Sequence, residues 1–286
     1  MKILVPRKET WPAASLDYIG KKKRLFVTRS QQRQQQNGSI NLVQSRQEDD
    51  SVEDRLLGAR PAENGEFPYQ ASLRVGTGHI CGAALIGKKH VLTAAHCLYA
   101  LRDIDTEYVS VLVGTNDLRL KDGTAYAVRK MTYHPGYVEK KSPDWMYDVG
   151  VIELKDEVKL TDRVGIVKLP TEAPKPGSTA IVTGWGATKA KSPTSPILQK
   201  LNLRVISLDK CRRSMPSYAR VHQSHVCTYV GTGLGSCSGD SGGPLVSNGV
   251  IIGIVSGGIP CARGYPDVFT SVYDYLPYIN SIVTKA

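Results

Sequence analysis

Short apolar runs separated by Gly, Pro, Asn and Asp fill residues 56–286, and they are the strongest constraint on the fold. Runs of this length suit strands and are too short for typical helices. One of them, LVSNGVIIGIV, places Asn248 and Gly249 between two apolar segments, which predicts a hairpin. The body is therefore expected to be all-β, as a sandwich or barrel. Its expected strands include YQASLRV (69–75), HICGAALIG (79–87), YVSVLVG (108–114), VGVIELK (149–155), TAIVTGWG (179–186), LNLRVISL (201–208) and GVIIGIVSG (249–257).

Three segments differ from this pattern. Residues 271–283, SVYDYLPYINSIV, are the only part expected to be helical, because apolar residues recur there at helical spacing. Residues 169–178, LPTEAPKPGS, are rich in proline and are expected to join two halves of the body. Residues 1–55 have no cysteine and little apolar periodicity, so we expect a disordered leader or propeptide before one domain at 56–286.

The composition excludes several classes of protein. The chain has 286 residues, is 41% hydrophobic and has a formal net charge of +11, as expected of a soluble basic protein. It contains no apolar run long enough to cross a membrane, so no membrane partner is expected. No basic-aromatic stripe or nucleic-acid motif accompanies the charge, and we interpret the charge as a solvated surface.

Six cysteines, at 81, 97, 211, 227, 237 and 261, predict three disulfides, since no C-x-x-C pair suggests a metal or redox site. Their spacing alone does not choose the pairing. Disulfides imply an oxidising compartment, and we expect an extracellular, secreted protein. The first residues, MKILVPRKETWPAAS, lack the apolar core of a signal peptide, and we interpret the export signal as lying outside this sequence.

The stretch GSCSGDSGGP, residues 235–244, holds Ser241 among closely spaced glycines. A serine hydroxyl becomes a nucleophile only with a base that takes its proton and with donors that stabilise the oxyanion. The small residues around Gly239 leave backbone N–H groups accessible for the second role. His96 in VLTAAHC is a candidate base, and Asp148 at the start of an apolar strand is the most attractive orienting acid.

These motifs resemble the trypsin/chymotrypsin family of serine proteases, and most closely the chymotrypsin-like and collagenase-like digestive enzymes of insects and crustaceans. The resemblance covers 56–286 and implies two packed six-stranded antiparallel β-barrels with a C-terminal helix and a cleft between the barrels. The segments that carry it are PYQASLR (68–74), HICGAALI (79–86), VLTAAHC (91–97), DVGVIEL (148–154), TGWG (183–186), GDSGGP (239–244), GIVSGG (253–258) and YPDVFT (265–270).

The resemblance assigns a role to each candidate in the catalytic group. Ser241 is the expected nucleophile, His96 the general base and then acid, and Asp148 the orienting acid. The N–H groups of Gly239 and Ser241 are expected to form the oxyanion hole. The implied disulfides are Cys81–Cys97, Cys211–Cys227 and Cys237–Cys261. The loop at 114–125 lacks the glutamate pair of calcium-binding relatives, so we expect no metal and no cofactor.

The resemblance also implies a zymogen. The sequence RLLGA at 55–59 stands where relatives have Ile-Val-Gly-Gly, and cleavage of the Arg55–Leu56 bond is expected. The new ammonium group of Leu56 would then pair with Asp240. Before cleavage, Ser72 and His79 match positions that hold the equivalent acid in an inactive arrangement.

The expected pocket for P1, the substrate residue before the scissile bond, has Gly235 at its base where trypsin-like relatives have an aspartate. Gly257 replaces an aromatic residue and is expected to leave one side open. Asp267 stands on the wall where most relatives have glycine, hydrated or hydrogen-bonded to Ser236. Trp145 is expected to line the neighbouring P2 subsite. The expected substrate-binding residues are Gly235, Ser236, Ser256, Gly258, Asp267 and Trp145.

These features predict a secreted serine endopeptidase that forms an acyl-enzyme and prefers large apolar P1 residues. The alternatives are an inactive protease homologue that binds partners and a trypsin-like cascade protease. Cascade enzymes often carry a cysteine-rich regulatory domain at the amino terminus. Residues 1–55 contain no cysteine, which favours a digestive or broad role. The expected partners of a monomeric enzyme are peptide substrates, an activating trypsin-like protease and protein inhibitors of serine proteases.

Overall fold

The computed structural model describes residues 59–139, 144–187, 192–259 and 263–284. The expected leader, residues 1–55, and the expected cleavage site at Arg55 and Leu56 lie outside these ranges.

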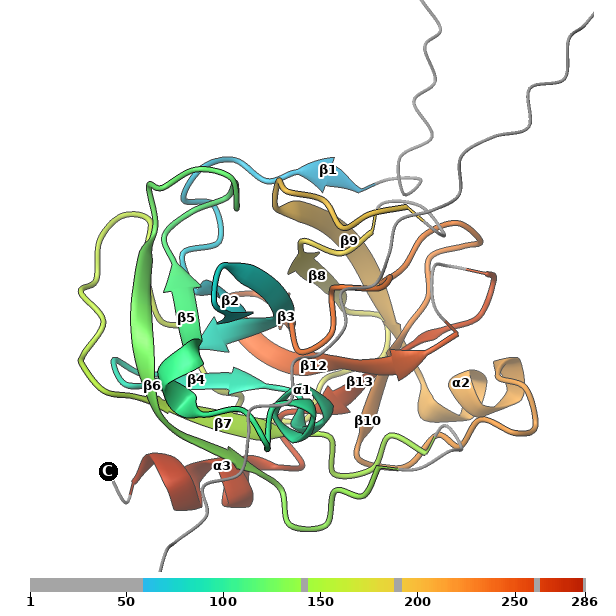
Figure 1. Ribbon diagram of the computed structural model, residues 1–286. Helices are drawn as coiled ribbons and strands as arrows, with labels where there is room; N and C mark the ends of the chain where they lie inside the picture. The colour runs from blue at the N-terminus through green and yellow to red at the C-terminus, as the bar shows by residue number, and fades with distance from the viewer. Residues whose placement is uncertain (1–58, 140–143, 188–191, 260–262, 285–286) are drawn as a thin grey trace, which may run out of the picture. The chain divides into compact units, whose positions relative to one another are not determined.

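The first half of the described chain forms a closed antiparallel barrel with the strand order β2-β3-β4-β7-β6-β5. In β5, Val109, Val111 and Val113 are buried most completely, and this two-residue period directs their face of the strand into the barrel, although Leu112 on the other face is also covered. Figure 1 shows these strands in cyan and green. They are β2 (Gln70–Val75), β3 (Gly78–Leu85), β4 (His90–Thr93), β5 (Val109–Val113), β6 (Thr124–Tyr133) and β7 (Gly150–Leu154).

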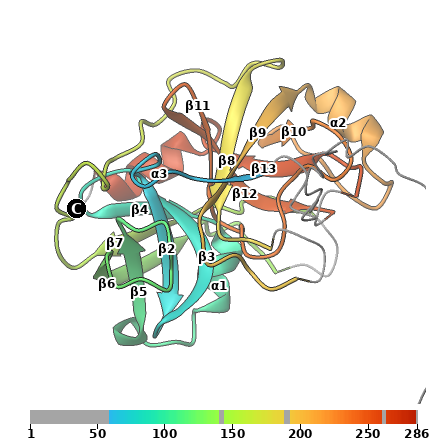
Figure 2. The ribbon, with the colours of Figure 1, turned by 90° about the horizontal axis from the view of Figure 1, so that it is seen from above.

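The second half forms another closed antiparallel barrel, because β8 pairs with both β9 and β11. The two-residue strand β1 (Arg60–Pro61) is added along β9. Figures 1 and 2 show this barrel in yellow to red beside the first. Its strands are β8 (Thr179–Gly184), β9 (Gln199–Ile206), β10 (His225–Thr228), β11 (Pro244–Ser247), β12 (Val250–Gly258) and β13 (Asp267–Ser271). The prediction of two six-stranded barrels is confirmed.

The hairpin at Asn248-Gly249 and the connection between the two barrels lie where the sequence predicted them. Asn248 and Gly249 have φ angles of 50° and 75°, which suits a tight hairpin between β11 and β12. The proline-rich segment 169–178 lies between β7 of the first barrel and β8 of the second. Direct contacts also join the barrels, for example the hydrogen bond of 2.6 Å from the Thr183 hydroxyl to the Gln70 side chain.

The helices are short, and the prediction that only the C-terminal segment is helical is wrong. Helices α1 (Ala95–Ala100) and α2 (Leu208–Ser214) and the 3-10 turn η1 (Thr106–Tyr108) also form. Each is too short to show a helical period in the sequence. The C-terminal helix, α3 (Leu276–Val283), begins later than the apolar pattern, because Pro277 is tolerated only in its first turn. Within the described ranges no helix has the length and apolar character needed to span a membrane.

Two of the implied disulfides are present, Cys81–Cys97 and Cys211–Cys227. Cys237 is also disulfide-bonded, and its expected partner, Cys261, lies outside the described residues. The first disulfide joins β3 to α1 at Cys97, which restricts the backbone next to His96.

Candidate active site

The site begins with His96 on α1 and Asp148, two residues before β7. The Nδ1 atom of His96 lies 2.8 Å from Oδ2 of Asp148, and the backbone N–H of His96 donates to Oδ1, also at 2.8 Å. Burial lowers the pKa of His96, but the charge and hydrogen bond of Asp148 outweigh burial and raise it above its usual value. With Nδ1–H donating to the carboxylate, Nε2 is the ring atom that can accept a proton.

Asp148 is held by donors from the second barrel as well. The hydroxyl of Ser256 on β12 donates to Oδ2 at 2.6 Å, and the hydroxyl of Thr270 on β13 donates to the backbone carbonyl of Asp148 at 2.9 Å. Ser256 was expected only as a substrate-binding residue, and Thr270 was not expected at all. Neither contact has a sequence signal, because both bring together strands from different barrels.

Ser241 lies where a loop of the second barrel meets the first. Its carbonyl accepts a hydrogen bond of 2.8 Å from the N–H of Gly82 on β3. The next residue, Gly242, has a φ of 77°, and a Cβ there would collide with the hydroxyl of Thr93 and lie 3.2 Å from the sulfur of Cys97. Glycine is required for this close approach. The loop that carries Ser241 therefore packs against the Cys81–Cys97 disulfide.

The backbone N–H groups of Gly239 and Ser241 donate to no acceptor among the described residues. Gly239 has a φ of 99°, a conformation that favours glycine. Two unpaired donors beside a serine hydroxyl are the components that an oxyanion hole requires.

The expected contact of Ser72 and His79 with Asp240 is absent from the described residues. Instead, His79 Nε2 lies 3.1 Å from the carbonyl of Gly239, and its Nδ1 lies 2.8 Å from the Ser72 hydroxyl. Because a carbonyl only accepts, Nε2 carries the ring proton and Nδ1 accepts from Ser72.

The carboxylate of Asp240 is directed toward the backbone of the second barrel. It accepts hydrogen bonds from the N–H groups of Gly186 at 2.8 Å and Cys237 at 3.0 Å. Burial raises its pKa to about 6, although both hydrogen bonds favour the charged form. A cavity of about 20 Å³ beside it is also lined by Ala59.

The expected P1 pocket is a cavity of about 150 Å³ that contains Ser241. The other candidate residues that line it are Ser236, Ser256, Gly258 and Asp267. Gly235 does not line it, which corrects the expectation for the pocket base. The reason is that the carboxylate of Asp267 covers Gly235, where a Cβ would overlap it.

Asp267 is buried and hydrogen-bonded as expected. Its carboxylate accepts from the Ser236 hydroxyl at 2.9 Å and from the Ser236 N–H at 3.2 Å. Burial raises the pKa of Asp267 to about 7, the Ser236 hydrogen bonds oppose that shift, and the charge of Asp240 adds to it.

Gly257 lines the pocket, and the space where its side chain would lie is occupied by another residue. The indole of Trp145 lies against Gly257, and a Cβ at this glycine would overlap Nε1, Cδ1 and Cε2 of the ring. An aromatic ring therefore lies beside Gly257, and it comes from the segment between β6 and β7, although Trp145 is not among the residues that line the pocket.

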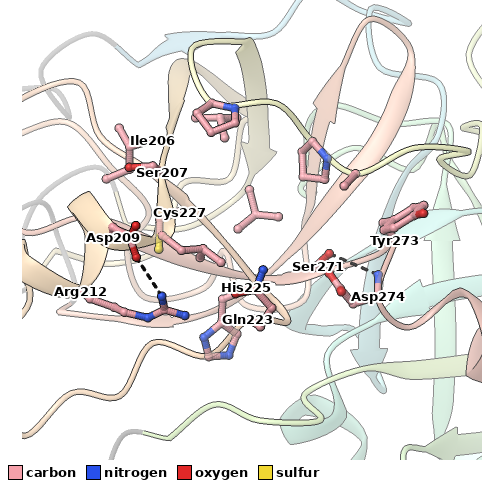
Figure 3. A pocket seen from close by; sticks show the side chains of 16 residues that line it. Ile206, Ser207, Asp209, Arg212, Gln223, His225, Cys227, Ser271, Tyr273 and Asp274 are labelled. Carbon is pink, nitrogen blue, oxygen red and sulfur yellow. Dashed lines mark hydrogen bonds and ion pairs between the residues drawn. The ribbon is translucent and has the colours of Figure 1, made fainter.

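A larger cavity of about 500 Å³ lies apart from these residues, on the second barrel between α2, β10 and the proline-rich segment. Figure 3 shows Arg212 paired with Asp209 on its wall, together with His225 and Tyr273. It contains none of the catalytic, oxyanion-hole, substrate-binding or activation residues expected from the sequence, and of the six cysteines only Cys227 lines it among the described residues.

Among the residues that the structure describes, one cluster has the spacing of metal ligands, namely Cys81, His96 and Cys97. The two sulfur atoms are joined in a disulfide, so neither is the thiolate that a metal would bind. The donor set therefore does not fit a metal ion.

Comparison with known proteins gives a consistent result. The family model described as Trypsin matches residues 56–279. The chain is 38% identical over 226 residues to Chymotrypsin-2 of Vespa crabro, covering 79% of this chain and 98% of that protein. It is 35% identical to Trypsin I-P1 of Gallus gallus over 241 residues, covering 82% and 92%. A solved structure of neuropsin, a serine protease expressed in the limbic system of mouse brain, is similar with a TM-score of 0.71 and 32% identity, covering 79% and 98%.

Proposed function

Because this chain belongs to the trypsin family and is a serine-type endopeptidase, we propose that it is a secreted enzyme, made as a zymogen, that prefers large apolar P1 residues. The observation that carries the proposed preference is the carboxyl group of Asp267, which is buried over Gly235 and bonded to Ser236. The disulfides support secretion, since they persist in oxidising compartments.

The proposed mechanism assigns one task to each group. Nε2 of His96 takes the proton of Ser241 as Oγ attacks the scissile carbonyl, and the N–H groups of Gly239 and Ser241 stabilise the oxyanion. His96 then gives the proton to the leaving amine, and an acyl-enzyme remains on Ser241. Water repeats the steps and releases the second product. Asp148 keeps His96 in the required tautomer and stabilises the imidazolium.

The pocket explains the proposed P1 preference. Its only described carboxyl group, Asp267, is neutral for much of the population near pH 7, so it is a weak partner for Lys or Arg. Burial of a large apolar P1 side chain contributes about 1.5–3 kcal/mol. Relatives named chymotrypsin and trypsin are both similar to this chain, so the pocket and not the family decides the preference.

We expect the wild-type enzyme to cleave Phe or Leu substrates better than Arg substrates, with a ratio that depends on pH. Asp267 has its pKa raised to about 7, so it gains charge as the pH rises from 6 to 8. The relative kcat/KM for Arg over Phe should therefore rise by about tenfold over that range. Paired P1-varied peptides measure this ratio, and the Phe peptide corrects for the titration of His96.

Asp267→Asn is the matched variant, because it keeps an oxygen for Ser236 and removes the charge. It should abolish the pH-dependent rise and the residual Arg cleavage while sparing Phe cleavage, and Asp267→Gly should do the same. Strict Arg specificity in the wild type, or an unchanged Arg ratio in both variants, would contradict the proposed pocket.

Activation is proposed to follow cleavage of the Arg55–Leu56 bond by a trypsin-like protease. The Leu56 ammonium group would pair with Asp240 and order the oxyanion loop. Two observations support this. Ala59, three residues further on, lines the same small cavity as Asp240, and the Asp240 carboxylate is buried with only N–H donors around it. Loss of one partner of a buried pair costs about 3–5 kcal/mol, enough to keep the zymogen inactive.

Amino-terminal sequencing of the active enzyme should therefore give Leu56 as the first residue. Arg55→Gln should block activation by a trypsin-like protease, and Arg60→Gln, an exposed arginine on β1, serves as the control. Full activity of an enzyme with any other amino terminus would rule out this activation step.

Two other assignments remain proposals. Trp145 beside Gly257 is proposed to narrow the P2 subsite and favour small residues or proline there. The protein partners are proposed to be the activating protease and protein inhibitors of serine proteases, acting on a monomer. An inactive homologue is disfavoured because Ser241, His96 and Asp148 are all retained.

A further inference from the structure

Asp148 lies at the centre of a tight turn, and its neighbour Tyr147 has an unusual backbone conformation. The N–H of Val149 donates to the carbonyl of Tyr147 at 2.8 Å, which closes a three-residue turn around Asp148. Tyr147 has a φ of 59°, which bulky residues rarely adopt unless their surroundings enforce it. The backbone that precedes the orienting acid is therefore held by contacts from elsewhere in the chain.

One of these contacts comes from Tyr275, the residue immediately before α3, which lies below β6 and β7 in Figure 1. The Tyr275 hydroxyl accepts a hydrogen bond of 3.0 Å from the N–H of Tyr147 and donates one of 3.2 Å to the hydroxyl of Ser224. Burial raises the pKa of Tyr275, so the hydroxyl stays protonated where His96 titrates. Among the described residues it is the only acceptor for the N–H of Tyr147.

The second contact is made by His134, immediately after β6. Its ring stacks on the ring of Tyr147, with centroids 4.7 Å apart and an interplanar angle of 14°. Its Nδ1 accepts the N–H of Gly136 at 3.0 Å, and burial lowers its pKa, which favours this neutral form. Its backbone N–H donates to the carbonyl of Val149 at 3.0 Å. His134 therefore contacts the residues on both sides of Asp148.

These contacts fix the direction in which the side chain of Asp148 leaves the backbone. Both carboxylate oxygens of Asp148 accept hydrogen bonds of 2.8 Å from His96, one from the backbone N–H and one at Nδ1. Two bonds to one carboxylate depend on its tilt as well as its position. Relaxation of Tyr147 to negative φ would rotate the residue that follows it and weaken at least one of these bonds.

We propose that His134 and Tyr275 are positioning residues, which hold Tyr147 at positive φ and thereby set the angle at which Asp148 meets His96. The proposal rests on the endopeptidase mechanism proposed above. Neither residue is catalytic, because neither lines the pocket that contains Ser241 and their described bonds go to other groups.

The first test is Tyr275→Phe, which removes the acceptor of the Tyr147 N–H but keeps a ring against those of His134 and Tyr147. We expect kcat to fall by about tenfold with little change in KM, because small misplacements of catalytic groups cost rate. The pKa of His96 should also fall, because Asp148 is the only described charge that raises it. The acid limb of kcat/KM should therefore move to lower pH. NMR titration of His96, identified by its absence in His96→Ala, measures the same shift without peptide hydrolysis.

Tyr278→Phe is the matched control. Tyr278 lies in the first turn of α3, and its ring also contacts that of His134, with centroids 4.8 Å apart. Its hydroxyl donates to the carbonyl of Thr132 at 3.1 Å and does not bond to the turn around Asp148. We expect a loss of thermal stability similar to that of Tyr275→Phe, with kcat within about twofold of wild type and the acid limb unchanged.

Tyr147→Asn tests the backbone strain directly, because asparagine adopts positive φ more readily than tyrosine. With asparagine at this position, the Tyr275 hydroxyl is no longer needed to enforce the conformation. In the Tyr147→Asn background, Tyr275→Phe should therefore change kcat by less than about twofold. The double-mutant cycle is expected to be strongly non-additive.

Two substitutions at His134 separate the ring from its hydrogen bond. His134→Phe keeps a ring against Tyr147 and loses the acceptor for Gly136, whereas His134→Asn keeps an acceptor and loses the ring. We expect His134→Phe to retain kcat within about threefold and His134→Asn to lower it by about tenfold. Only His134→Asn should move the acid limb to lower pH.

Titration with a covalent serine reagent counts the active sites of each variant before rates are compared. A wild-type enzyme that is not labelled would show that the proposed protease mechanism fails, and the NMR titration of His96 would then decide the positioning proposal. An unchanged His96 titration in Tyr275→Phe, equal effects of Tyr275→Phe and Tyr278→Phe, or an additive cycle would overturn that proposal. If Tyr275→Phe does not fold, the two variants at His134 decide it, and equal behaviour of these two would overturn it.

Discussion

Ser241→Ala is expected to lower kcat by about 10⁶, and His96→Ala by a similar factor, because nucleophile and base act as a unit. Loss of Oγ removes the acyl-enzyme pathway. The fold should remain, because the contact of residue 241 with Gly82 is made by the backbone carbonyl. Peptide hydrolysis at saturating substrate measures kcat, and thermal unfolding checks the fold.

The matched control is Ser281→Ala, an exposed serine on α3 whose hydroxyl bonds only to the local Tyr278 carbonyl. An organophosphate reagent should label the wild type and Ser281→Ala but not Ser241→Ala. A wild-type protein that is not labelled would favour the inactive-homologue alternative. Near wild-type turnover in Ser241→Ala would show that another residue is the nucleophile.

Asp148→Asn should lower kcat by about 10⁴ with little change in substrate affinity. Asp148 accepts from three donors, the N–H and Nδ1–H of His96 and the hydroxyl of Ser256. An amide has one oxygen, so its NH₂ group must face a donor. If it faces Nδ1, the ring proton moves to Nε2, and Nε2 can no longer take the proton of Ser241. If the amide group is rotated by half a turn, its NH₂ group faces the backbone N–H of His96 instead, and two donors then oppose each other.

The control is Asp156→Asn. Asp156 is an exposed carboxylate shortly after β7 and lies outside this hydrogen-bond network, so its substitution by Asn should leave kcat within about twofold. Comparison of kcat with KM separates an effect of Asp148 on catalysis from an effect on substrate affinity. A loss confined to KM, or a fall in kcat below tenfold, would contradict its assignment as the orienting acid.

Much of the fold follows from local patterns. Short apolar runs bounded by turn residues predicted strands such as β5 and β12, and Asn248-Gly249 predicted the hairpin between β11 and β12, because strand and turn preferences depend on a few neighbouring residues. The short helices α1 and α2 could not be predicted in this way. Each contains a disulfide-bonded cysteine, Cys97 in α1 and Cys211 in α2, and such a constraint leaves no periodic signal.

The sequence alone determined the chemistry that is available: a serine in a glycine-rich loop, a histidine beside a cysteine, and an acid at the start of a strand. Only the tertiary structure decided where the side chains beside them lie. Asp267 covers Gly235, Ser256 holds Asp148, and Trp145 occupies the space above Gly257. Each of these contacts joins segments far apart in the chain, and its geometry depends on how two closed barrels pack. No local pattern encodes such a distance, because the strand register and barrel contacts that set it are formed by the whole domain.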